Sequence, residues 1–186
     1  MNISQLLNDA GQVLRLRYRA AAEYRYPLPV CLAVLVAVGA VQTPGAVPIF
    51  GGGDATAAFI ILLSVLRCIL LAKTMSAVLH YFGSEKLPLF GYCVLTEALI
   101  LPSVLIFYLP ESFAPVFVFW SAWTFWVQCI GFYHLGKQGV FKILLGYLAY
   151  LLASLFAGAL LLSLFVGMQW FDLAVLQENL KNFGAL

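Results

Sequence analysis

The chain has 186 residues, of which 63% are hydrophobic and 10% charged, and its formal net charge is +2. Since about a quarter of the residues in a soluble domain are charged, this composition excludes a soluble globular protein and predicts an all-α, polytopic membrane protein. No cluster of Lys and Arg alternates with aromatic residues, so we expect no nucleic-acid partner; the lipid bilayer and other membrane proteins remain as partners.

Residues 1–26 are a polar lead-in that predicts an amphipathic helix lying in the membrane interface. Its apolar residues recur at helical spacing: Ile3, Leu6, Leu7, Ala10, Leu14, Tyr18 and Ala21. The other faces carry polar and charged residues, among them Asp9, Arg19 and Glu23. A cleaved signal peptide begins with a short basic segment, whereas this lead-in is long and contains carboxylates, so we interpret the first apolar run as a retained anchor.

Five apolar runs follow, and we expect each to cross the membrane as a helix. They cover residues 27–41, 56–79, 87–109, 115–132 and 140–166. Most approach or exceed the roughly 20 residues that a crossing needs. The first is short, and the prolines and glycines of residues 44–53 predict a non-helical stretch, either a loop or a segment that dips back into the membrane. Pro102 predicts a kink in the third run, and Pro110 and Pro115 bracket a tight turn.

The chain ends in a segment, residues 167–186, that predicts a second interfacial helix. Its apolar residues share one face: Leu173, Leu176, Leu180 and Phe183. We therefore divide the chain into an N-terminal helix at 1–26, a five-helix transmembrane bundle at 27–166 and a C-terminal interfacial helix at 167–186.

Lysine and arginine residues outside the predicted spans indicate the orientation. One side of the membrane would carry seven of them: Arg15, Arg17, Arg19, Arg25, Lys86, Lys137 and Lys142. The opposite side would carry Lys181 alone. The rule that cytoplasmic loops are rich in these residues places the N-terminus in the cytoplasm and the C-terminus outside. The short loops favour the inner membrane of a bacterium.

Two opposite charges lie deep in neighbouring predicted spans. Gly83 lies in the turn between the second and third predicted spans. Arg67 lies 16 residues before Gly83, and Glu97 lies 14 residues after it. At about 1.5 Å per residue, their depths differ by only ~3 Å. An unpaired arginine in the middle of a span costs about 2.5 kcal/mol or more, so we predict an Arg67–Glu97 ion pair that faces the interior of the bundle.

Two interpretations of this pair stay open: it only clamps the second and third spans together, or it lines a polar pocket or ion path. Lys73 lies closer to the cytoplasmic end and is expected to extend its ammonium to the interface. His80 and His134 lie at the cytoplasmic ends of spans and are expected to be solvated. A metal site shared by the two histidines would need further ligands at suitable spacing, which the sequence does not offer.

Small residues in the last span predict close helix packing. Gly146 lies in this span, and Ser154 and Gly158 form a small-xxx-small pair that lets helices approach, within the bundle or across a dimer face. Four cysteines lie in apolar runs without a CxxC spacing, and we expect them to pack rather than to form a disulfide or bind a metal: Cys31, Cys68, Cys93 and Cys129.

No P-loop, GxSxG or HExxH motif occurs, and the loops are too short to hold a soluble catalytic site. We therefore expect a protein that is not an enzyme and that has no cofactor or metal.

Two segments carry a family resemblance. The segment "GKQGVFKILLGYLAYLLASLFAGALL" (residues 136–161) joins a short basic turn to a tyrosine-containing span, and "LPLFGYCVLTEALILPSVL" (residues 87–105) has Gly-Tyr followed by Pro. With five spans and a cytoplasmic N-terminus, the chain resembles the Yip family of Ypt/Rab-interacting membrane proteins over roughly residues 55–165. The acidic-aromatic-Gly-Pro signature of many eukaryotic members is absent before the first span, so the resemblance does not extend to binding of a small GTPase.

The resemblance implies a five-helix bundle with a non-enzymatic role in scaffolding, trafficking or protein association. The alternative hypothesis is a small transporter or ion-conducting subunit that uses Arg67 and Glu97. A water-filled cavity that reaches Glu97 would favour the alternative.

Overall fold

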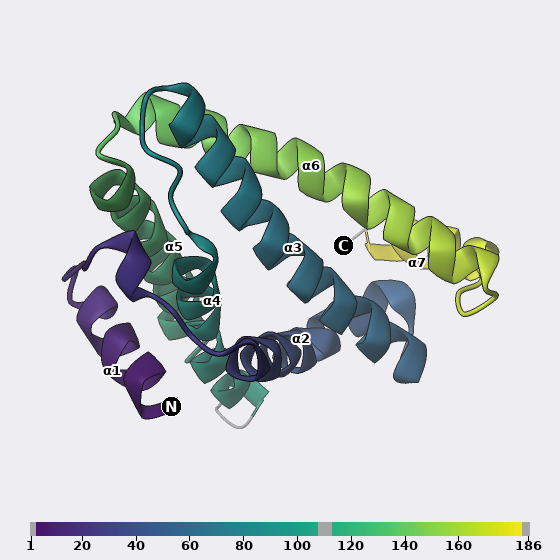
Figure 1. Cartoon of the computed structure of the whole chain (residues 1–186). Helices are drawn as coiled ribbons and strands as arrows, with labels where there is room; N and C mark the ends of the chain where they lie inside the picture. Colours follow the sequence, from purple (N-terminus) through teal and green to yellow (C-terminus); the bar gives the residue numbers. More distant parts are fainter. Residues whose placement is uncertain (1–2, 108–112, 184–186) are drawn as a thin grey trace.

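The computed structural model of the chain describes residues 3–107 and 113–183, and in this part it contains helices and turns but no strand (Figure 1). The predicted all-α class is thereby confirmed. The helices are, in chain order, α1 (Ile3–Leu14), η1 (Ala21–Glu23), α2 (Leu28–Phe50), α3 (Asp54–Tyr81), α4 (Phe90–Ala98), η2 (Leu101–Phe107), α5 (Ala114–Gly136), α6 (Val140–Gly167) and α7 (Leu173–Phe183). The predicted turn between Pro110 and Pro115 lies partly outside the described residues.

Four of these helices, α2, α3, α5 and α6, are long and apolar enough to cross a membrane. Four helices of this kind are consistent with a polytopic helical membrane protein. The boundaries of α3, α5 and α6 lie within four residues of the predicted spans. The number of qualifying helices nevertheless differs from the five that we predicted from the sequence.

The predicted third span accounts for the difference. Its residues form the nine-residue helix α4, a turn, and the seven-residue 3₁₀ helix η2. Pro102 explains the break, because a proline has no N–H and its ring collides with the carbonyl group four residues earlier in an α-helix. That earlier residue is Ala98, where α4 ends.

The first span is longer than predicted. Helix α2 continues through Pro44 and Pro48 to Phe50, so the prediction of a non-helical stretch at residues 44–53 is wrong for most of its length. Within membranes, neighbouring helices help a helix to tolerate prolines, and α2 packs along α3. The turn to α3 starts at Gly51, whose φ of +79° suits glycine.

Helix α3 lies at the centre of the bundle, because it packs along both α2 and α6 (Figure 1). Glycines make both contacts close. A Cβ atom on Gly39 would lie 2.6 Å from the Cα of Ile61, and one on Gly146 would lie 2.5 Å from the Sδ of Met75. Small residues at such positions let helix backbones approach each other within a membrane. Gly146 therefore lies where α3 and α6 meet.

Different segments are hydrogen-bonded at the two ends of the bundle. At one end, the Ser84 hydroxyl, after α3, donates to the carbonyl of Gly136 at the end of α5 over 2.7 Å. At the other end, the side chain of Asn179 in α7 donates to the carbonyl of Ile49 in α2 over 3.1 Å. Leu176 of α7 is buried in a cluster there with aromatic residues of α3 and α6. Helix α7 thus packs against the bundle.

The N-terminal segment also packs against the bundle, because α1 contacts α4 and α5 (Figure 1). Asp9, predicted on a polar face, is instead 1% exposed. Its carboxylate lies 3.2 Å from a guanidinium nitrogen of Arg19 and accepts a hydrogen bond from the Tyr26 hydroxyl over 2.9 Å. Burial, and then the hydrogen bond to Asp9, raise the pKa of Tyr26, so this tyrosine stays a neutral donor. These partners explain how the carboxylate tolerates burial.

Candidate functional site

Arg67 lies near the middle of α3, 13 residues after Asp54 and 14 before Tyr81. Its side chain is exposed, and its Nε donates to the hydroxyl of Tyr150 in α6 over 3.1 Å. Among the described residues, the one ion pair with a nitrogen–oxygen distance within 4.0 Å joins Arg19 and Asp9. The direct Arg67–Glu97 ion pair expected from the sequence is therefore not formed.

The direction of the side chain explains this result. Helix α3 turns Cys68, which is fully buried, toward the core cluster that includes Cys93 of α4. Consecutive residues of a helix point about 100° apart, so Arg67 points to one side of Cys68, where it meets Tyr150 of α6. Glu97 lies half-buried in the last turn of α4.

A neutral polar cluster joins the helices at the level of Gln128 in α5. The Gln128 amide donates to the Thr96 hydroxyl of α4 and accepts from the Tyr147 hydroxyl of α6, each over 2.8 Å. The hydroxyls of Tyr18 and Tyr92 both donate to the carbonyl of Val127, over 2.9 and 3.2 Å. We call Tyr18, Tyr92, Thr96, Gln128 and Tyr147 the tyrosine–glutamine cluster.

This cluster ties α4, α5, α6 and the N-terminal segment together, and its uncharged side chains bond to one another and to backbone carbonyls of α5. Chemically it suits helix association rather than proton or ion movement, since interhelical hydrogen bonds hold membrane helices together. This cluster was not predicted from the sequence. The signal that could have indicated it is an amide, Gln128, inside the apolar run 115–132.

The two candidate histidines make separate contacts. His80 places Nδ1 2.9 Å from the carbonyl oxygen of Ser84, at the end of α3. The His134 ring stacks on Tyr18, with 5.3 Å between ring centroids. In residues 3–107 and 113–183, no group of three or more His, Cys, Asp or Glu side chains is arranged to hold a metal ion.

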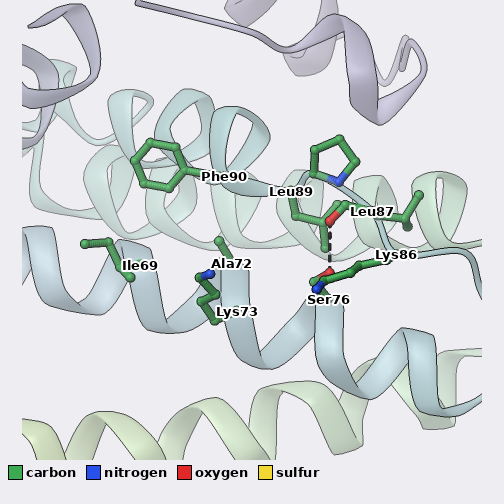
Figure 2. A pocket seen from close by; sticks show the side chains of 9 residues that line it. Ile69, Ala72, Lys73, Ser76, Lys86, Leu87, Leu89 and Phe90 are labelled. Atoms are coloured by element: carbon green, nitrogen blue, oxygen red, sulfur yellow. Dashed lines mark hydrogen bonds between the residues drawn. The ribbon is translucent and has the colours of Figure 1, made fainter. Parts of the chain in front are cut away.

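A groove of about 520 Å³, here called the lysine groove, lies between α3 and the segment that leads into α4 (Figure 2). Two of its lining residues are cationic, Lys73 of α3 and Lys86 of the following segment. The remainder of the lining comprises Ile69, Ala72, Ser76, Leu87, Pro88, Leu89 and Phe90. The Ser76 hydroxyl donates to the Leu87 carbonyl over 2.9 Å, which holds the segment against α3.

A second groove, of about 700 Å³, opens between α5 and α6. Its lining is apolar and aromatic and includes Trp126 and Tyr150, the residue that binds Arg67. The other packing candidates of α6 are less closely engaged than Gly146. A Cβ on Gly158 would make an ordinary 3.8 Å contact with Leu63, and the Ser154 hydroxyl donates to a carbonyl of its own helix.

No family model matches this chain, and no curated protein or solved structure matches it significantly.

Proposed function

We propose that this protein is a non-enzymatic membrane protein that binds another membrane protein through the face that carries Arg67. The supporting observation is an exposed guanidinium at the middle of α3 with one hydrogen bond among the described residues, to Tyr150. An arginine side chain has five N–H donors, and lipid acyl chains offer no acceptor. A partner helix with a carboxylate or carbonyl oxygen at this depth would satisfy them.

The surface beside Arg67 suits such a partner. Helix α6 has 28 residues, of which only Ile143, Gly146 and Phe165 are buried, and nearly half are exposed, so one face of it points outward. The α5–α6 groove runs along this helix, and Tyr150 lines it. A partner helix seated there would lie next to Arg67. A scaffolding, trafficking or association role is also what the resemblance to the Yip family implies, and that resemblance stays a prediction.

The alternative, a transporter that uses Arg67 and Glu97, needs a water-filled path to Glu97. Neither of the two grooves described above is lined by Glu97 or Arg67. These two grooves therefore give the transport alternative no support.

Replacing Arg67 tests the proposal. A photo-crosslinking residue at Leu151, in the α5–α6 groove, should trap one discrete membrane protein. We expect Arg67→Leu to reduce this adduct by about 10- to 100-fold, because hydrogen bonds to charged groups contribute about 1.5–3 kcal/mol. Arg67→Lys, which keeps the charge, should retain most of it. The measurement is the yield of the adduct by mass spectrometry after purification in mild detergent.

The control position is Val36, which is exposed on α2. The photo-crosslinking residue placed there should trap no discrete protein. Unchanged adducts in Arg67→Leu, or adducts with lipid alone at Leu151, would contradict the proposed association.

We also propose that α4 and η2 together cross the membrane, which makes five crossings with a cytoplasmic N-terminus and an external C-terminus. Nine α-helical residues at about 1.5 Å and seven 3₁₀ residues at about 2.0 Å give about 28 Å, close to the roughly 30 Å of a hydrocarbon core. Lys86 and Lys137 both lie near the end where Ser84 meets Gly136, as the charge rule requires of a cytoplasmic end. The inner membrane of a bacterium stays the predicted location.

Cysteine labelling of intact cells checks this topology. We expect a membrane-impermeant maleimide to label Phe113→Cys, beyond the proposed crossing, and to label Glu85→Cys only after the cells are opened. Gly52→Cys, between α2 and α3, serves as the external control, since a Cβ there would have nothing within 4 Å. If Glu85→Cys and Phe113→Cys react from the same side, the α4–η2 segment does not cross.

A further inference from the structure

We propose that the lysine groove binds an anionic phospholipid, with the headgroup phosphate held between Lys73 and Lys86. This inference does not depend on the partner proposed for the Arg67 face. It rests on the charge of the groove, on its apolar lining and on its place at one end of the bundle.

The charge of the groove calls for an anion. Figure 2 shows the Lys86 side chain extending from the following segment toward α3, where Ser76 lies, and Lys73 lies about one turn before Ser76 on α3. Within the described residues, neither ammonium has a carboxylate within 4.0 Å. The ion pair found there joins Arg19 and Asp9. Two like charges that share a groove repel each other, and a phosphate between them removes the repulsion by accepting hydrogen bonds from both.

The lining of the groove selects an amphiphile over a free ion. Apart from the two lysines, its side chains are mostly apolar, and Ile69, Leu89 and Phe90 are examples. Inorganic phosphate would gain nothing from such surfaces, whereas the glycerol backbone and the first methylene groups of a phospholipid would cover them. A volume of about 520 Å³ accommodates a headgroup with the start of its chains.

The position of the groove fits the depth of a lipid headgroup and its upper chains. Lys73 lies eight residues before Tyr81, the last residue of α3, which places its Cα about 12 Å along the helix from that end. Its long side chain shortens this distance by extending toward the interface. The hydrogen bond from Ser76 to Leu87 keeps the second lysine-bearing segment close to α3 at this level. Basic pockets between helices on the cytoplasmic side typically bind anionic headgroups.

Native mass spectrometry of the full-length protein tests the proposal, with phosphatidylglycerol and phosphatidylcholine of the same acyl chains as probes. We expect retained phosphatidylglycerol and little phosphatidylcholine. Lys73→Gln/Lys86→Gln should weaken phosphatidylglycerol binding by about 30-fold and leave phosphatidylcholine unchanged. Lys73→Arg/Lys86→Arg should restore the binding, because the charge is kept.

The matched control is Lys137→Gln/Lys142→Gln, which removes the same charge at the same end of the bundle outside the lysine groove. It should bind phosphatidylglycerol like the wild type. Equal losses in both double variants, or no loss in Lys73→Gln/Lys86→Gln, would overturn the proposal. Complete displacement of the lipid by glycerol phosphate would also overturn it, since the anion alone would then be the ligand. Circular dichroism and size-exclusion chromatography establish that each variant is folded before the comparison is made.

Discussion

Gly91→Ala is expected to detach the N-terminal segment from α4 and to destabilise the protein by about 3 kcal/mol or more. A Cβ atom at this position would lie 1.8 Å from the carbonyl oxygen of Tyr24 and 2.8 Å from its carbonyl carbon. Both are backbone atoms, so no change of rotamer relieves the collision. Tyr24 is 3% exposed and packs on Tyr92, with ring centroids 5.5 Å apart, so its displacement opens the core.

The thermal midpoint in detergent and the rate of proteolysis within residues 1–26 measure this effect. Gly45→Ala in α2 is the matched control, because a Cβ there would have nothing within 4 Å. A helical alanine with free space should leave the stability unchanged or raise it by roughly 0.5–1 kcal/mol. If Gly91→Ala melts and resists protease like the wild type, Tyr24 does not lie against α4 in the membrane.

Gly131→Ala is the second substitution with a large expected effect, about 3 kcal/mol of destabilisation. The added Cβ would lie 1.8 Å from the hydroxyl oxygen of Tyr92 and 2.4 Å from the ring carbon that carries it. Tyr92 is fully buried and cannot turn away. The collision therefore breaks its hydrogen bonds to the carbonyls of Val127 and Gln128 and disturbs the tyrosine–glutamine cluster.

A double-mutant cycle with Tyr92→Leu isolates this mechanism. Tyr92→Leu alone removes the hydroxyl, replaces the aromatic ring with a shorter side chain and destabilises the protein, but it also empties the space that the added methyl group of Gly131→Ala needs. The two effects should be non-additive, with Gly131→Ala costing at least about 1 kcal/mol less in the Tyr92→Leu background. Strictly additive thermal or denaturant midpoints would show that Tyr92 does not occupy the space beside Gly131.

The sequence by itself determined the helical class of the protein and the bounds of three of its long helices. Composition alone required a helical membrane protein, because so few charges cannot cover a soluble surface. The runs that became α3, α5 and α6 were located to within four residues. Depth can be counted in this way because each helical residue advances the chain by a constant rise, which is why Arg67 was correctly placed near the middle of its helix.

Only the tertiary structure decided which way side chains point and what they meet. Arg67 was assigned to Glu97 from depth, but the rotation of α3 directs it to Tyr150, and that rotation depends on packing against several helices at once. Asp9 was assigned to a polar face, yet Arg19 and Tyr26 make a buried position for it. The continuation of α2 past Pro44 was likewise visible only in the structure, whereas the break at Ala98 follows from Pro102 itself. Depth is a property of one helix and can be read from its residues, whereas orientation about the helix axis is a property of the whole bundle.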